Sequence, residues 1–266
     1  MKEVAPARNA RGFTRIELIV AMAIFLIICA AMFELLQLSQ QKYASENQLS
    51  GTFQEARLAL DQIARDVDDS GYPSLGMFSN IPTNASVYVS SPVAWSPSYP
   101  TSSCQVGTAG GGTCLTPGDF DLILETTVNG TVSWIRYQLP VGSTTLYRAV
   151  VSKTGGDPWG PTSTPGVMVP FLTNVMNNAT GQLAQITATY PSMFPSGQPV
   201  PIFQYTCDTS AGQEAPCPTA GASNSPANIR DVDITLIVMT QQPDAQTHAL
   251  KLVELNGRGH RANPSY

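Results

Sequence analysis

The chain has 266 residues, a formal net charge of −5, and only 12% charged residues. That charged share is about half of the usual proportion, so the surface must be largely neutral and polar. The few Lys and Arg residues are scattered, so no basic stripe indicates nucleic-acid binding. The chain also lacks an HExxH motif, a Walker loop, a nucleophile elbow and a dinucleotide signature. We therefore expect neither enzymatic activity nor a cofactor.

A basic segment followed by an apolar run opens the chain. Lys2, Arg8 and Arg11 precede an unbroken run of 16 apolar residues from Leu18 to Phe33. With its flanks, the span 13–36 is about 36 Å long as a helix, which suffices to cross a bilayer once. The positive charges predict that the leader stays in the cytoplasm and that everything after the helix lies outside.

Glu17 stands at the edge of this apolar run. A carboxylate at membrane depth is costly unless it is paired. Taken alone, Glu17 reads as a boundary charge near a helix start, where the helix dipole favours an acid. The full string from Gly12 to Phe25, GFTRIELIVAMAIF, changes that interpretation. It resembles the class III signal of type IV prepilins and of type II secretion pseudopilins.

The resemblance implies three properties of this segment. A membrane aspartic prepilin peptidase would remove the leader 1–12 by cutting between Gly12 and Phe13. The new amino terminus of Phe13 would be N-methylated. Glu17 would act in filament assembly by pairing with the terminal amine of a neighbouring pilin or pseudopilin subunit, which supplies the partner that an acid among apolar helices requires. Arg15 departs from the family pattern, in which a hydrophobic residue is more usual.

Two other export signals share the layout of basic residues before an apolar run. A lipoprotein signal would need small residues just before Cys29, and Ile27 and Ile28 occupy those positions. Conventional cleavage near Ala30 would leave Glu17 unexplained at the start of the apolar run. The prepilin interpretation therefore explains more of the segment.

Beyond the membrane span, the segment 37–71 continues as an amphipathic helix. Gly71 followed by Pro73 supplies the stop that helices commonly use. The apolar residues recur at steps of three and four, which predicts one stripe facing a partner. We expect the carboxy-terminal domain to cover the stripe, and a coiled-coil dimer through it is the alternative. The stripe comprises Leu49, Phe53, Ala56, Leu60, Ile63 and Val67.

Residues 72–266 carry strand signals. Asn129-Gly130 favours a two-residue turn, which predicts a hairpin over 120–139. A change of side-chain parity after Trp134 indicates either a bulge or a strand buried on both faces. Alternating apolar residues predict another strand over 231–238. Further strands are expected at 86–90, 145–151, 183–190, 200–206 and 247–255. The predicted fold class is α+β, a long amino-terminal helix packed on a mostly antiparallel β-sheet.

A weaker resemblance extends along the chain. The helix exit from Ala64 to Tyr72, the triplet Ile135-Arg136-Tyr137 and the triplet Leu146-Tyr147-Arg148 are similar to those of PilW-type minor pilins and GspJ-type pseudopilins. These patterns imply a fold grouping rather than binding residues. Within that family, such subunits are rare components that often prime assembly at the filament tip.

The chain has five cysteines. Cys29 lies in the apolar run, where a free thiol behaves as a small hydrophobe. The other four form two pairs of identical spacing in loops that should face an oxidising exterior. They allow three connectivities, of which we favour the two local bonds. A zinc site is the alternative, but the pairs lack CxxC spacing and neither histidine is near in sequence. The four residues are Cys104, Cys114, Cys207 and Cys217.

Four acidic residues lie on or beside the predicted strands. They are Asp119, Asp121, Asp231 and Asp233. Carboxylates can gather around calcium. Strand alternation instead favours placing them on solvent-facing sides, with no metal.

These features predict a structural minor subunit of a type IV pilus or related filament. The subunit would be anchored by its helix in the bacterial cytoplasmic membrane before it joins a filament on the cell surface or in the periplasm. One alternative is a tip adhesin whose loop 91–118 binds a surface or glycan. A type II secretion pseudopilin is the other.

Overall fold

The computed structural model describes most of the chain. The described residues are 14–106, 113–209, 212–214, 217, 225–244, 247 and 249–262. The leader 1–12 and the predicted cleavage and methylation site at Gly12 and Phe13 lie outside the described residues.

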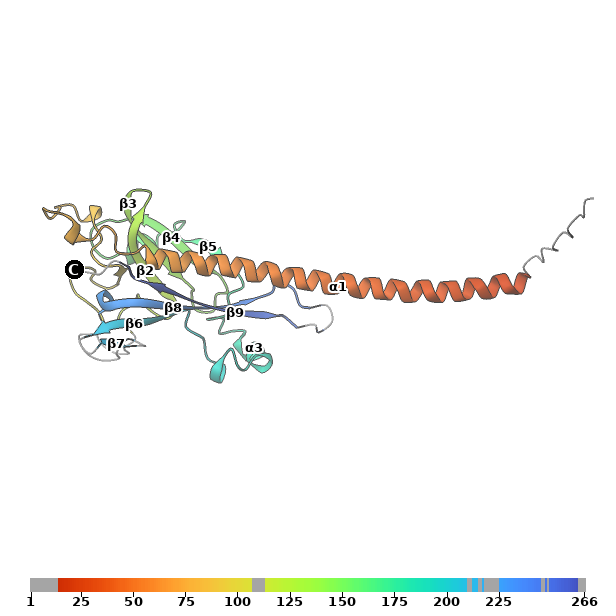
Figure 1. Cartoon of the computed structure of the whole chain (residues 1–266). Helices are drawn as coiled ribbons and strands as arrows, with labels where there is room; N and C mark the ends of the chain where they lie inside the picture. The colour runs from red at the N-terminus through yellow and green to blue at the C-terminus, as the bar shows by residue number, and fades with distance from the viewer. Residues whose placement is uncertain are drawn as a thin grey trace, which may run out of the picture.

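A single long helix, α1, dominates the shape of the molecule (Figure 1). It runs over Arg15–Asp68, 54 residues, which corresponds to about 81 Å. The backbone N–H of the capping residue Asp69 donates to the carbonyl of Arg65 and closes the last turn. Gly71 has a φ of +90°, a conformation that favours glycine. The helix therefore ends where the Gly-Pro signal predicts.

Two antiparallel sheets form the head around the outer half of α1. The five-stranded sheet has the order β1-β2-β3-β4-β5 and the four-stranded sheet the order β7-β6-β8-β9. The predicted α+β class is confirmed. The strands of the first sheet are β1 (Val93–Ala94), β2 (Asp121–Val128), β3 (Thr131–Gln138), β4 (Leu146–Ser152) and β5 (Val169–Leu172). Those of the second are β6 (Phe203–Thr209), β7 (Gly212–Glu214), β8 (Ile229–Met239) and β9 (Leu252–His260).

Short helices occupy the connection from α1 to the first strand and several connections between the strands. They are η1 (Leu75–Met77), η2 (Ala85–Val87), α2 (Trp159–Thr162), α3 (Leu183–Thr189), η3 (Pro195–Gly197) and η5 (Pro226–Asn228).

The predicted hairpin is confirmed as β2 and β3. The two strands pair from Asp121 with Gln138 to Val128 with Thr131. Asn129 and Gly130 have φ values of +50° and +80°, as the two-residue turn requires. The ladder has no register shift, and β3 is buried on both faces from Val132 to Tyr137. Burial on both faces, rather than a bulge, therefore explains the change of parity.

The other strand predictions have mixed outcomes. The strand predicted at 231–238 is β8, and those at 145–151 and 200–206 correspond to β4 and β6. The prediction at 247–255 overlaps β9, which begins at Leu252. Two predictions are wrong. The segment 86–90 begins in η2 and contributes only an isolated bridge, and 183–190 contains the helix α3. In α3, Leu183 and Ile186 lie three residues apart and share one face, which packs on a small second core with Phe194.

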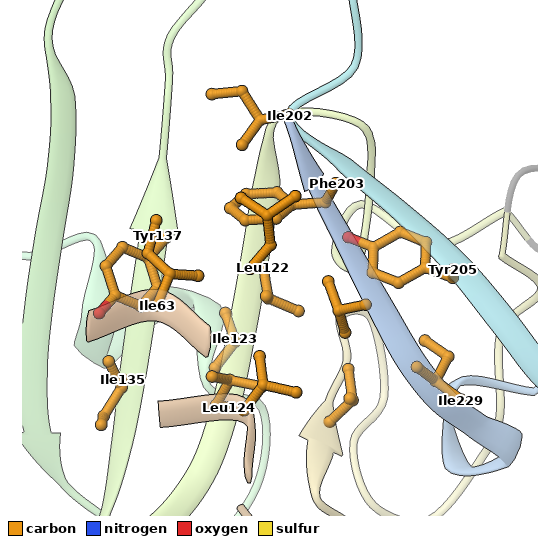
Figure 2. Packing of buried hydrophobic residues seen from close by; sticks show 14 of the residues in the cluster. Ile63, Leu122, Ile123, Leu124, Ile135, Tyr137, Ile202, Phe203, Tyr205 and Ile229 are labelled. Atoms are coloured by element: carbon orange, nitrogen blue, oxygen red, sulfur yellow. The ribbon is translucent and has the colours of Figure 1, made fainter. Parts of the chain in front are cut away.

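The main core lies between α1 and the two sheets, as Figure 2 shows for Ile63 and the β2 residues Leu122 to Leu124. The helix buries Ala56, Leu60, Ile63 and Val67 of the predicted stripe, whereas Phe53 remains 40% exposed. The stripe is thus covered by the head of the same chain. This confirms the predicted packing and leaves residues 56–67 unavailable for a coiled-coil seam.

Candidate functional site

The amino-terminal end of α1 is closed by its own side chains. Thr14 is the capping residue, and its backbone N–H donates to Glu17 Oε2 at 2.9 Å. The Thr14 hydroxyl donates to the same oxygen at 3.0 Å, and Glu17 N–H donates to Thr14 Oγ1 at 3.3 Å. This reciprocal capping box satisfies helix donors that would otherwise lack partners. It also fixes the Glu17 carboxylate at the start of the helix.

The inner half of α1 presents apolar side chains all round. Among the described residues, α1 is the one helix long and apolar enough to cross a membrane. The free thiol Cys29 is half-buried within this stretch. A helix that is apolar on every face needs either lipid or other helices around it. Its exposed large side chains include Ile16, Leu18, Ile19, Val20, Met22, Ile24, Phe25, Leu26, Ile27, Ile28, Met32, Phe33, Leu35, Leu36 and Leu38.

Two glycines of β9 allow the outer half of α1 to approach the second sheet closely. A Cβ atom at Gly257 would lie 2.8 Å from Leu60 Cδ1, and one at Gly259 would lie 2.5 Å from Val67 Cβ. Real Cβ atoms do not come so near other heavy atoms, so only glycine fits at these positions without displacement.

A polar triad fixes the same part of α1 to the first sheet. Asp66 is buried at the interface and accepts from Tyr137 Oη at 2.6 Å and from Arg148 Nη2 at 2.8 Å. Burial, followed by the neighbouring Asp66 charge, raises the pKa of the Tyr137 phenol, which therefore stays protonated as a donor. Packing against one sheet and hydrogen bonding to the other together set the rotation of the helix.

A second polar contact ties the β8–β9 connection to α1 nearer its apolar inner half. Ser45 Oγ donates to Asp244 Oδ2 at 2.8 Å, and Lys251 Nζ lies 2.7 Å from the same carboxylate oxygen. Lys251 Nζ also donates to Ser45 Oγ at 3.1 Å. The head therefore contacts α1 from Ser45 to its end.

A buried ion pair lies within the first sheet. Lys153 Nζ is 2.5 Å from Glu125 Oε1, and both side chains are almost completely buried. Trp134 Nε1 donates to Glu125 Oε2 at 3.1 Å, and the Tyr99 hydroxyl donates to the same oxygen. Burial is the main cause that raises the pKa of Tyr99, and the Glu125 charge adds to it.

Lys153 completes its hydrogen bonds on the segment before β1. Its Nζ atom donates to the Tyr88 carbonyl at 2.8 Å and to Ser90 Oγ at 2.9 Å. Ser90 N–H donates in turn to Glu125 Oε1 at 2.8 Å. Because every group of the pair is satisfied, the cluster fastens this segment to the sheet.

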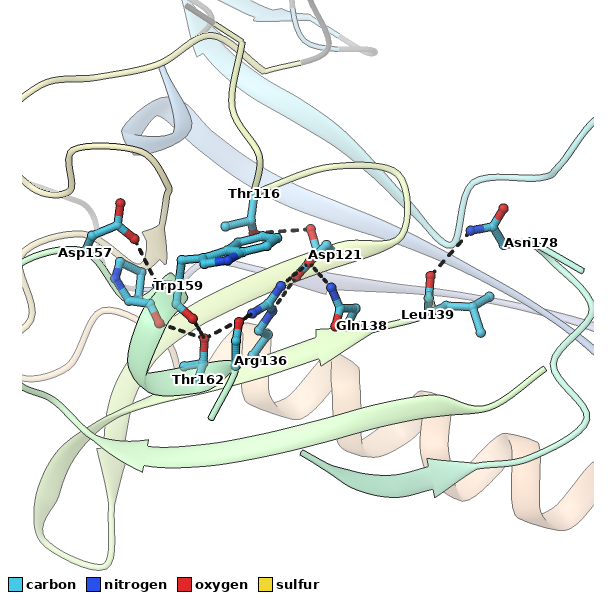
Figure 3. Close-up of polar contacts among 11 residues, drawn as sticks. Thr116, Asp121, Arg136, Gln138, Leu139, Asp157, Trp159, Thr162 and Asn178 are labelled. Atoms are coloured by element: carbon cyan, nitrogen blue, oxygen red, sulfur yellow. Dashed lines mark hydrogen bonds and ion pairs between the residues drawn. The ribbon is translucent and has the colours of Figure 1, made fainter. Parts of the chain in front are cut away.

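A second buried pair overturns part of the prediction for the acidic residues (Figure 3). Asp121 accepts from Arg136 Nε at 2.9 Å and Nη2 at 2.5 Å, and the Arg136 guanidinium stacks 4.1 Å from the Trp159 ring centroid. Burial raises the pKa of Asp121, although Arg136 and Gln138 act in the opposite direction. The expectation that Asp121 faces solvent is therefore wrong.

Asp231 is also buried rather than solvent-facing, because it contacts both Arg258 and His260 on β9. Asp233 is half-exposed and pairs with Arg258 Nε at 3.2 Å. Opposite charges on adjacent strands can neutralise an acid on a face that the sequence alone would assign to solvent. Among the described residues, no group of three or more His, Cys, Asp or Glu side chains is placed to hold a metal ion.

The four cysteines of the head form the two local disulfides, Cys104–Cys114 and Cys207–Cys217. Ser103, next to the first bond, donates from Oγ to Ser225 Oγ at 2.7 Å. This contact joins the segment beside the first bond to the residue that precedes η5.

The sequence did not single out Asp66, Glu125, Lys153, Gly257 or Gly259. The sequence does contain a signal for the buried pair of Glu125 and Lys153. Glu125 directly follows the apolar run Leu122–Leu124, and Lys153 closely follows Ala149–Val151. A lone charge at such a position requires a partner. The partner's identity becomes visible only in the fold.

Comparison with known proteins finds a family match for the amino-terminal segment. Residues 7–33 match the family model of the prokaryotic N-terminal methylation motif. No curated protein and no solved structure matches the chain. The matched region contains Glu17 and continues without a break into the exposed apolar part of α1. The chain therefore combines a prepilin-type amino-terminal motif with a single long helix and an antiparallel β-rich head, which is a pilin-like α+β architecture.

Proposed function

We propose that the chain is a minor structural subunit of a type IV pilus or related filament. It waits in the cytoplasmic membrane with its head outside and then enters the filament through α1. A prepilin peptidase cuts between Gly12 and Phe13, and the Phe13 amine is methylated. The subunit belongs with the PilW-type and GspJ-type components rather than with an enzyme class.

One observation supports this proposal most. The motif at residues 7–33 leads into a helix whose apolar side chains are exposed all round as far as Leu38, whereas one face of the same helix is buried by its own head from Ala56 to Val67. The exposed apolar half of the helix needs lipid or neighbouring helices around it. The half under the head already has its apolar face covered. A subunit that moves from the bilayer into a bundle of similar helices meets both conditions.

The proposed role of Glu17 is to select and align the adjacent subunit in the filament. In the bilayer its carboxylate is held by Thr14 at the helix start, close to headgroups and water. In the filament, the terminal amine of an adjacent subunit would face it. Desolvation can cancel the Coulombic gain of such a pair, so the pair would set register more than it adds stability.

The test compares Glu17→Ala with the control Glu34→Ala, a second exposed acid on the same helix. Membranes and sheared filaments from both strains are probed for the subunit. We expect Glu17→Ala to insert, to lose its leader and to fold, but to be depleted from filaments. Glu34→Ala should be incorporated like the wild type. Equal recovery of Glu17→Ala in filaments, with unchanged filament number, would contradict the assembly role and leave Glu17 as a boundary charge.

A further inference from the structure

The chain that leaves α1 forms a loop at the end of the head farthest from the membrane helix, drawn in orange to yellow in Figure 1. We call residues 72–89 the distal loop. Val89 N–H donates to the Pro73 carbonyl at 2.7 Å, and Ser74 bridges to Val89, so the loop is closed at its neck. It contains the two short helices η1 and η2.

The distal loop exposes large apolar side chains. Tyr72 is 52% exposed, Met77 58%, Ile81 72% and Val87 41%. Elsewhere in the described head beyond residue 70, the exposed large apolar side chains are single residues of separate segments: Leu115, Val141, Val150 and Val169. Single exposed apolar residues are normal on a soluble surface, but the distal loop carries four of them within one closed loop, and such a concentration of exposed apolar surface marks an interaction site.

The same region carries no charge. From Ser70 to Gly118 the sequence contains no Asp, Glu, Lys, Arg or His, although the whole chain has 33 acidic and basic residues. The cores of protein–protein interfaces are depleted of charged residues and enriched in aromatic residues and methionine. The composition of the distal loop fits that pattern. A complementary partner surface must also be uncharged, because a charge buried against it would have no counter-ion.

The loop is held at both ends. Thr127 Oγ1 donates to the Tyr72 carbonyl at 2.9 Å, and the buried Lys153 donates to the Tyr88 carbonyl at 2.8 Å. Anchored ends reduce the conformational entropy that binding would otherwise remove. The Lys153–Glu125 pair therefore also holds one end of the distal loop in place.

We propose that the distal loop is the docking surface for a neighbouring pilin-type subunit on the side away from the membrane. This rests on the proposed filament function, in which subunits share one polarity. The apolar helix and the distal loop lie at opposite ends of the molecule, so the loop faces the next subunit outward. Attachment to an external surface or glycan is the rival use of the same face.

The test places a photo-crosslinking amino acid at position 81 in the full-length chain and, as a control, at position 141. Val141 is at least as accessible as Ile81, at 82% against 72% exposure, but lies in the connection between β3 and β4. We expect position 81 in purified filaments to capture a protein that itself carries a prepilin leader, identified by mass spectrometry. Position 141 should not capture that protein.

Substitution gives an independent readout. Ile81→Lys and Met77→Lys change exposed side chains, so the fold should persist. If these residues are central to the interface, each change should reduce recovery of the partner with the subunit by about tenfold. Val141→Lys should leave it unchanged.

The outcomes separate the two proposals. A wild-type chain that is absent from filaments would overturn both. A chain present in filaments, with no prepilin-type protein captured at position 81, would overturn the docking surface alone. Normal partner recovery by Ile81→Lys, together with lost attachment of cells to surfaces, would assign the distal loop to adhesion instead.

Discussion

Val67 of α1 lies directly over Gly259 of β9, so a Cβ atom at position 259 would be 2.5 Å from Val67 Cβ and 3.1 Å from the Ala64 carbonyl oxygen. Neither neighbour is the flexible end of a side chain. Gly259→Ala should therefore force the helix away from the sheet and lower the free energy of unfolding by ~1–3 kcal/mol. Denaturant unfolding of the detergent-solubilised chain measures this change.

Two other glycines provide controls. A methyl group at Gly257 meets the branched end of Leu60, which can move, so Gly257→Ala should cost less. Gly51 has nothing within 4 Å and lies inside α1, so Gly51→Ala should be neutral or stabilise by up to ~1 kcal/mol. If Gly259→Ala and Gly51→Ala had the same free energy of unfolding, the close approach of helix and sheet would be contradicted.

Lys153 neutralises a carboxylate that has almost no access to water. Lys153→Met should leave Glu125 charged and buried, and the free energy of unfolding should fall by ~3–5 kcal/mol. Lys251→Met removes a more exposed ion pair with Asp244 and should cost no more than ~1 kcal/mol. Adding Glu125→Gln to Lys153→Met should recover much of the loss. Failure of the double variant to recover would mean that packing, rather than charge, explains the effect.

Asp119 is exposed, as the sequence predicts, but partial desolvation raises the pKa of its carboxyl group above the ordinary value. Between the unfolded and the folded pKa, the folded state binds more protons, so Asp119 lowers the stability as pH rises through that window. Because water screens an exposed group, Asp119→Asn should stabilise the chain only slightly at pH 7, and the difference should vanish as pH falls below the ordinary aspartate pKa. Thermal unfolding of both proteins across this range tests the sign. A variant that was less stable at pH 7 would contradict it.

The two disulfides each close a loop with a sequence separation of 10 residues. Loop closure of this length should stabilise the head by about 2.5–3 kcal/mol per bond. Replacing both Cys207 and Cys217 by alanine should lower the unfolding midpoint in denaturant accordingly. Non-reducing peptide mapping should recover Cys104 with Cys114 and Cys207 with Cys217. Crossed pairs or free thiols in mature protein would contradict the local scheme.

The amino terminus of the mature chain shows whether the leader is cleaved after Gly12. Mass analysis should find methylated Phe13 as the first residue, as the resemblance to prepilins predicts. Loss of residues 1–12 removes three basic residues and one acid, so the formal charge moves from −5 to −7. The mature subunit should therefore have a lower isoelectric point than the precursor. A terminus near Ala30 would refute this processing.

The sequence by itself predicted the features that depend on neighbours along the chain. The prepilin-like motif around Glu17 is identified by its resemblance to a known signal. The long helix with its Gly71 stop and the Asn129-Gly130 hairpin follow from local periodicity and turn chemistry. The helical stripe also predicted which face of α1 the head covers. These signals need only a few adjacent residues, and tertiary packing did not override them.

Only the tertiary structure decided the partners of buried charges and the use of the short apolar segments. Alternation placed Asp121 and Asp231 toward solvent, but Arg136 and Arg258 on adjacent strands pair with these two acids, and His260 also contacts Asp231. The strand predicted over residues 183–190 is instead a helix, because Leu183 and Ile186 share one face only at helical spacing and that face packs near Phe194. Burial of a charge depends on a counter-charge that is distant in sequence, so its position becomes known only when the strands are paired.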